Sequence, residues 1–126
     1  MVSHPETVAT AIRVGNPASW LLAEAARDES GGLIAAVSDL DILRAQRDLA
    51  LRDGVFVEPA SAAGVAGLLA RSGRRLVESG MVVTVTVTGH GLKDIDTPLE
   101  FHGAPDELVV DADVDQAAAA AGLVHG

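Results

Sequence analysis

The shortage of aromatic side chains constrains the core of this chain more than any other feature. Trp20, Phe56 and Phe101 make up only 2% of its 126 residues, so the interior must be built from Ala, Val, Leu and Ile. Each of these side chains buries less apolar surface than an aromatic ring and contributes less to stability. A chain of this length forms one domain at most, and we expect a thin core for a free-standing domain.

The charge balance and the missing cysteines exclude several classes of protein. Nine Lys and Arg residues stand against 18 Asp and Glu residues, which gives a net charge of −9. Nucleic acid is therefore not an expected partner, because its phosphate backbone requires a basic surface. The absence of cysteine excludes thiolate metal sites and disulfides and fits a reducing compartment. No apolar run is long enough for a membrane span, and we expect a soluble, cytoplasmic protein.

Hydrophobic periodicity and breaker residues divide the chain into alternating helices and strands. Helices are predicted at residues 7–14, 17–28, about 39–53, 60–70 and, more weakly, 115–121. Strands are predicted at residues 33–37, 55–57 and 81–88. A turn region is expected at residues 71–80, and the chain beyond Leu92 is rich in loop residues. This alternation predicts an α/β fold, a partial parallel sheet with helices on both faces.

Two of the predicted helices begin with recognisable capping residues. Asn16 can cap a helix that starts at Pro17, whose fixed φ suits a first helical position. Ser38 and Asp41 have the spacing of a capping box, with Asp in place of Glu. The helix that follows is expected to end near Gly54.

Two segments follow predicted strands, where parallel α/β sheets bind their ligands. These segments are Glu58-Pro59-Ala60-Ser61 and Thr88-Gly89-His90-Gly91. Glycines in the second segment would let the backbone approach a ligand closely. Taken alone, each segment also has a structural reading. The first is then a helix start with Glu and Ser near its positive end, and the second is a connecting turn.

Three motifs, in this order and spacing, resemble the threonine synthase family. They are TVATAIRVGNPASW at residues 7–20, EPASAA at residues 58–63 and TVTGHGLKD at residues 86–94. That family uses pyridoxal phosphate to convert O-phosphohomoserine and water into threonine and phosphate. The resemblance therefore implies a lyase of threonine biosynthesis and part of the large domain of a fold type II pyridoxal-phosphate enzyme.

The resemblance extends from about Val2 to Thr97 and fades in an acidic, Ala-rich tail. It implies that residues 1–97 are the C-terminal part of a threonine synthase-like catalytic domain and that residues 98–126 are a diverged tail. Most of the family's active site is missing from this stretch. The Schiff-base lysine in a Ser-Phe-Lys-Asp context and the phosphate-binding loop have no counterpart here, so no catalytic residue is predicted.

The one lysine of the chain, Lys93, does not replace the missing one. It follows Gly-His-Gly-Leu, and in the resembled family this lysine is not the Schiff-base residue. Met1 then resembles an internal start, and we expect an inactive C-terminal fragment. Such a fragment is expected to self-associate or to pair with a complementing N-terminal fragment.

The resemblance assigns cofactor binding to four residues. The Thr88 hydroxyl faces the pyridine nitrogen of pyridoxal phosphate, Ala11 forms the wall beside the ring, and Glu58 and Ser61 lie near the cofactor edge. Each has a structural alternative: Thr88 as a strand residue bonded to a turn, Ala11 as a buried helical alanine, Glu58 as a helix cap and Ser61 as a residue near the positive end of a helix. The four histidines lack metal-ligand spacing, so no metal is predicted.

A function of a different class stays open beside this one. The chain would then be a stand-alone, non-catalytic module that kept part of the fold to bind a partner or a small ligand. Its only support is the acidic tail at residues 106–115. An adjacent upstream frame that encodes the lysine and the phosphate loop would favour the enzyme fragment instead.

Overall fold

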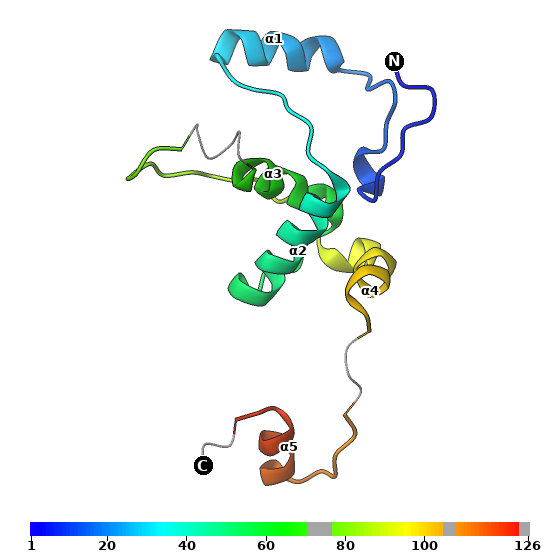
Figure 1. Ribbon diagram of the computed structural model, residues 1–126, viewed down its shortest axis with the longest axis vertical. Coiled ribbons are helices and arrows are strands. Elements are labelled where there is room, and N and C mark those ends of the chain that lie inside the picture. Colours follow the sequence, from blue (N-terminus) through cyan, green and yellow to red (C-terminus); the bar gives the residue numbers. More distant parts are fainter. Residues whose placement is uncertain (71–76, 105–107, 124–126) are drawn as a thin grey trace.

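The computed structural model describes residues 1–70, 77–104 and 108–123. Within these ranges the chain forms the helices α1 (Trp20–Ser30), α2 (Asp39–Asp53), α3 (Pro59–Leu69), α4 (Asp96–His102) and α5 (Val114–Ala120). Of two 3-10 helices, η1 (Thr10–Ile12) precedes α1 and η3 (Gly91–Asp94) lies between α3 and α4. Figure 1 shows α2 and α3 side by side at the centre, with α1 and α5 at opposite ends of the molecule.

Helix α2 begins and ends where the sequence predicts. The Ser38 hydroxyl accepts the Asp41 N–H at 3.2 Å and donates to the Asp41 carboxylate at 2.6 Å. Gly54 ends the helix in the left-handed conformation with φ of 67°, which costs glycine little. The apolar residues Ile42 and Ala45 are buried on the inner face of the helix. The prediction for this helix is confirmed.

The core lies between α2 and α3 and consists mostly of small side chains. Helix α3 begins at Pro59, one residue before the helix predicted at 60–70, and packs along α2. Neither Trp20 nor Phe101 is buried, and Phe56 is half-buried. The buried apolar cluster contains four alanines and two larger residues: Ala9, Ile42, Ala45, Val57, Ala62 and Ala66. The core is therefore thin, as the shortage of aromatic residues predicts.

The predicted partial parallel sheet with helices on both faces is wrong. Among the described residues no strand forms, and the only β pairing is an isolated antiparallel bridge between Val57 and His90. β-branched residues favour a pleated surface only where neighbouring strands and side chains pack against it. The segment 81–88 has no paired strand in the described chain, and its Val82 is 95% exposed. The fold of the described residues is mainly helical.

The predicted helix at residues 7–14 is reduced to the single turn of η1. Thr7 Oγ1 accepts the Ala9 N–H at 3.2 Å and donates to Asp39 Oδ1 at 2.5 Å. Such a local bond from a side chain to the backbone competes with regular helix formation. The second bond, from Thr7 to Asp39, connects the N-terminal segment to the first turn of α2. Ala9, two residues later, lies in the core.

Helix α1 starts later than predicted. Its N-cap is Ser19 and its first residue is Trp20, so Asn16 and Pro17 lie outside the helix. No residue of α1 is buried, and the side chain of Leu21 is 63% exposed. The apolar residues whose spacing predicts this helix therefore do not pack against a core in the described chain.

The chain beyond Leu92 contains more helix than predicted. Helix α4 has the buried Pro98 in its first turn, a position that proline tolerates. Helix α5 matches the predicted terminal helix, and Asp113 caps it by accepting the Gln116 N–H at 2.9 Å. Part of the predicted turn region at 71–80 and part of the acidic tail lie outside the described residues. Within the described chain, none of the helices has the length and apolar character that a membrane crossing requires.

Candidate functional site

The two segments predicted to follow strands meet at the start of α3. The Glu58 N–H donates to the Gly89 carbonyl at 3.0 Å, and the Gly91 N–H donates to the Phe56 carbonyl at 3.0 Å. These two backbone bonds flank the isolated antiparallel bridge described above. They hold the turn at residues 88–91 against the N-terminal end of α3.

Ser61 fastens the same turn from within the first turn of α3. Its Oγ accepts the Thr88 N–H at 3.1 Å and the Gly89 N–H at 2.7 Å. The same atom lies 3.2 Å from Thr88 Oγ1. Ser61 is buried, whereas Thr88 is exposed. Two residues predicted from separate motifs thus share one hydrogen-bonded cluster.

Glu58 brings a buried carboxylate to this cluster. Its side chain is 5% exposed, and its Oε2 lies 3.5 Å from Lys93 Nζ, whose side chain is 65% exposed. A buried charge is costly unless it is paired, and Lys93 supplies that pairing. The one lysine of the chain is therefore engaged with Glu58 at the surface and is not held in a desolvated pocket.

The glycines of the turn allow two segments of the chain to approach closely. A Cβ at position 89 would overlap the Glu58 carboxylate. A Cβ at position 91 would overlap the ring of Phe56. Gly89 and Gly91 therefore have a packing role in this structure, in addition to any ligand approach expected from the sequence.

Ala11 lies outside the cluster of Glu58, Ser61 and Thr88. It is exposed in η1 and is not the buried helical alanine of the structural alternative. Its neighbour Thr10 donates a hydrogen bond to Asp94 Oδ2 at 3.2 Å. This bond links the first motif to the third, because Asp94 belongs to η3 directly after the Thr88 turn.

Gln46 is a contributor to the site that the sequence analysis missed. It is 1% exposed on α2, and its Nε2 donates to the Val57 carbonyl at 2.8 Å. Its Oε1 is buried without a hydrogen-bond partner among the described residues. Gln46 thus fixes the backbone immediately before Glu58. The available signal was a polar residue one position after Ala45, on the apolar face of α2.

The described residues contain no cluster of three or more histidine or acidic side chains that could hold a metal ion. His90 Nδ1 accepts the Leu92 N–H at 3.1 Å, which makes it a turn residue. His125 lies outside the described residues.

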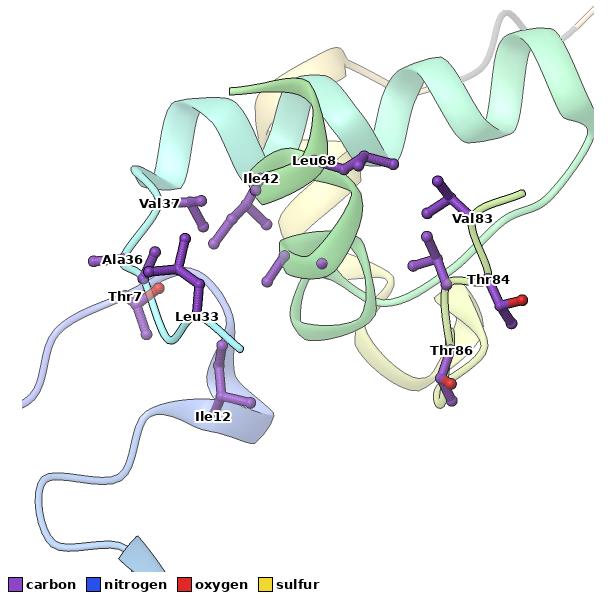
Figure 2. Close-up of a pocket in the computed structure, with 15 residues that line it drawn as sticks. Thr7, Ile12, Leu33, Ala36, Val37, Ile42, Leu68, Val83, Thr84 and Thr86 are labelled. Carbon is purple, nitrogen blue, oxygen red and sulfur yellow. The ribbon is translucent and has the colours of Figure 1, made fainter. Parts of the chain in front are cut away.

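A broad apolar groove of about 830 Å³ lies beside α3. Figure 2 shows Leu33 and Val37 on one side of it and Val83 and Thr86 on the other, with Ile42 and Leu68 between them. The two flanking segments are the ones that the sequence predicts as strands at 33–37 and 81–88.

Comparison with known proteins decides the family. Residues 1–89, well over half of the chain, match the family described as pyridoxal-phosphate dependent enzymes. The chain belongs to this family. The resemblance inferred from the three motifs is thereby confirmed.

Named members of the pyridoxal-phosphate family are similar over most of this chain. It is 50% identical to the threonine synthase of Mycobacterium leprae over 111 residues, 88% of this chain and 31% of the relative. It is 56% identical to that of Mycobacterium tuberculosis (strain H37Rv) over 99 residues, 79% of this chain and 28% of the relative. The threonine synthase of Synechocystis is 53% identical over 102 residues, 81% of this chain and 26% of the relative. The chain thus spans less than a third of the length of these curated relatives.

The residues present fit one edge of pyridoxal phosphate, the cofactor of the family. Thr88 is exposed, and its hydroxyl makes one side-chain contact in the described chain, to Ser61. A hydroxyl has one proton and two lone pairs, so Thr88 keeps capacity for another hydrogen bond. The Lys93 side chain is 65% exposed, and its Nζ lies 3.5 Å from the Glu58 carboxylate. The hydroxyl of Thr88 thus fits a polar contact to pyridoxal phosphate, whereas Lys93 lies at the surface and not in the desolvated pocket that a Schiff-base lysine requires.

Proposed function

We propose that this chain is the C-terminal part of a threonine synthase, a lyase that converts O-phosphohomoserine and water into threonine and phosphate. The observation that carries the proposal is the identity of 50% to 56% with threonine synthases across 79% to 88% of the chain. When bound, pyridoxal phosphate supplies an electron sink for proton removal next to the substrate's amino group. The chain alone is inactive, because it lacks the covalent lysine and the phosphate loop of the family.

Within the complete enzyme, Thr88 donates its hydroxyl proton to the pyridine nitrogen of the cofactor. Its exposure at the turn and its capacity for another hydrogen bond support this role. A hydroxyl binds a neutral ring nitrogen but does not balance a full positive charge there, so the electron sink is moderated. Ala11 forms the wall beside the ring, and Glu58 and Ser61 lie behind Thr88 at the cofactor edge.

The division of the chain follows the same proposal. Residues 1–97 are part of the catalytic domain, and residues 98–126 are a diverged tail. The family match ends at residue 89 and α5 buries none of its residues, which supports a tail at the C-terminal end, whereas the 111-residue similarity to the Mycobacterium leprae relative extends past residue 97. We assign the enzyme to the cytoplasm.

The apolar groove beside α3 receives the part of the enzyme that this chain does not contain. Two observations support this partner. The chain supplies only 26% to 31% of the length of its relatives. The groove is flanked by residues 33–37 and 83–86, most of whose apolar side chains are exposed and which have no strand pairing in the described chain. Segments of this kind accept added strands through backbone hydrogen bonds.

Reconstitution tests the proposed function. This chain is co-expressed with the part of the Mycobacterium tuberculosis relative that it does not cover, and phosphate release from O-phosphohomoserine is measured. The expected result is activity in the purified pair and none in either part alone. A pair that copurifies and binds pyridoxal phosphate but releases no phosphate contradicts the proposal and favours the non-catalytic module.

A further inference from the structure

The hydrogen bonds around Ser61 Oγ leave only one arrangement of its proton. A serine hydroxyl has one proton and two lone pairs. The N–H groups of Thr88 and Gly89 donate to this oxygen at 3.1 Å and 2.7 Å and occupy both lone pairs. The remaining contact, 3.2 Å to Thr88 Oγ1, must then use the proton of Ser61. Ser61 donates to Thr88, and Thr88 accepts.

This assignment fixes the role of the Thr88 hydroxyl as well. One lone pair of Thr88 Oγ1 faces Ser61, so the Thr88 proton must point in another direction. The Thr88 side chain is exposed, so this other direction leads away from buried Ser61. A threonine hydroxyl without such a contact rotates among several positions and alternates between donor and acceptor.

The support behind Ser61 is rigid. Both donors that occupy its lone pairs are backbone N–H groups, and the Glu58 N–H donates to the Gly89 carbonyl at 3.0 Å from the same end of α3. Ser61 itself is 5% exposed, two positions after Pro59 at the helix start. A buried oxygen with all its hydrogen bonds made has no alternative arrangement nearby.

We infer that Ser61 is a positioning residue, which orients the Thr88 hydroxyl as a donor toward an aromatic nitrogen. This inference rests on the proposed contact of Thr88 with the pyridine nitrogen and explains how the contact is held. A donor that is already oriented does not have to reorganise when charge develops on its acceptor. Preorganised hydrogen bonds stabilise such developing charge most strongly. Ser61 then acts through Thr88 and does not itself touch the cofactor.

The test uses the complete enzyme reconstituted from this chain and its complementing part. Pyridoxal phosphate labelled with ¹⁵N in the ring is bound, and the ¹⁵N chemical shift of the ring nitrogen and kcat are measured for Ser61→Ala, Thr88→Val and the double variant. Thr88→Val is expected to move the ¹⁵N shift and to lower kcat by about tenfold to a hundredfold. Ser61→Ala is expected to move the ¹⁵N shift in the same direction and to lower kcat by about tenfold, with KM little changed.

The double variant gives the decisive comparison. If Ser61 acts only through Thr88, the double variant has the kcat and the ¹⁵N shift of Thr88→Val alone. If the double variant loses kcat by the product of the two single losses, or if Ser61→Ala has the wild-type ¹⁵N shift, the inference about Ser61 is overturned. The contact of Thr88 with the ring nitrogen would not be affected by either result. A wild-type ¹⁵N shift in Thr88→Val overturns the contact itself, and the inference with it.

Two further variants separate positioning from folding. Ser61→Cys keeps the shape of the buried side chain, with a somewhat larger sulfur atom, but weakens its hydrogen bonds, so it is expected to move the ¹⁵N shift even if Ser61→Ala fails to fold. Ser38→Ala removes a hydroxyl that likewise accepts a backbone N–H at a helix start, far from Thr88 in sequence. It is expected to lower thermal stability and to leave the ¹⁵N shift unchanged. A shift that moves equally in Ser38→Ala and Ser61→Cys would overturn the inference.

Discussion

The helix pair α2–α3 and the segment 81–88 are both rich in apolar residues, yet only the helix pair forms a core. Ile42 is 2% exposed in α2, whereas Val82 and Val83 are 95% and 44% exposed. The partner of α2 is the next helix along the chain, so their contact needs only a short connection. The segment 81–88 has no paired strand in the described chain. Burial therefore follows the availability of a partner more than the propensity of the residues.

Helix α1 shows the same contrast with α2. Both helices carry apolar residues at helical spacing, but α1 buries none of them. Its side-chain interactions are local, with Arg27 close to Asp28 at 2.7 Å and to Glu24 at 4.0 Å. Exposed ion pairs of this kind contribute little to stability. The tertiary stability of the chain is concentrated in α2, α3 and the turn that they hold.

Truncation of a core residue should give the largest change in stability. Ile42→Ala removes a buried side chain between α2 and α3 and is expected to lower the free energy of unfolding by about 2 to 5 kcal/mol. Leu21→Ala, the matched change on α1, removes a side chain that is 63% exposed. It is expected to change the free energy of unfolding by about 0.5 kcal/mol or less. Urea denaturation measures both. Equal losses in the two variants would contradict the division between the two regions.

A methyl group at the turn should have a smaller but clear effect. Gly89→Ala places a Cβ against the Glu58 carboxylate and is expected to destabilise the chain by about 1 to 3 kcal/mol. Adding Glu58→Ala removes the obstacle and is expected to recover part of this loss.

Gly64→Ala on α3 is the matched control for that change. Its Cβ would make ordinary contact with Val85 at 3.5 Å, and alanine favours a helix over glycine by up to about 1 kcal/mol. Thermal melting should therefore show stabilisation in Gly64→Ala and destabilisation in Gly89→Ala. The same sign in both would show that the turn does not pack against Glu58.

The exposed groove should make the isolated chain self-associate. Large exposed apolar patches drive association, and the groove of about 830 Å³ is lined mostly by apolar residues. Val83→Lys places a charge in the groove and is expected to shift size-exclusion elution toward the monomer. Val109→Lys, at a residue that is 92% exposed and does not line the groove, is expected to leave elution unchanged. A wild-type monomer with a sharp, reversible melting transition would contradict this prediction.

The smallest expected effect is a pH dependence of stability at His102. Burial lowers the pKa of His102 below its usual 6.5, and the nearby Arg47 lowers it further, against a hydrogen bond to the Leu43 backbone that raises it. The unfolded chain then binds the proton more readily, so stability is greatest above pH 6.5 and falls as the pH drops toward the folded pKa. The side chain is largely exposed, so the effect is small.

Melting temperatures between pH 5 and pH 8, roughly the range in which histidine titrates, measure this dependence. His102→Gln should flatten the fall at low pH. A fall that persists unchanged in His102→Gln would assign it to other groups.

The helices with capping signals and local partners could be predicted from the sequence. Ser38 and Gly54 bound α2, and Pro59 begins α3, because these residues act on the backbone next to them. Residues 81–88 were predicted wrongly for the opposite reason, since a strand depends on neighbours that its own sequence does not contain. Helix α4 is not predicted, because the chain beyond Leu92 is rich in loop residues; its Pro98 lies in the first turn, where proline does not break a helix.

The candidate site was predictable only in part. The motif resemblance named Glu58, Ser61 and Thr88, and the structure brings them together across 27 residues of sequence between Ser61 and Thr88. The resemblance did not indicate that Ser61 forms hydrogen bonds with Thr88, nor that the Gln46 side chain donates to the Val57 carbonyl. These contacts depend on how α2, α3 and the turn pack, which no local pattern encodes.

Turnover of Thr88→Val in the reconstituted enzyme tests the central claim most directly. Valine preserves the shape of threonine but lacks its hydroxyl, so the turn should survive while the hydrogen bond to the cofactor is lost. We expect the release of phosphate from O-phosphohomoserine to slow by about tenfold to a hundredfold, with pyridoxal phosphate still bound. Thr86→Val, the same change two residues earlier, should leave the cofactor spectrum unchanged. Wild-type turnover and an unchanged cofactor spectrum in Thr88→Val would contradict the claim that this turn faces the cofactor.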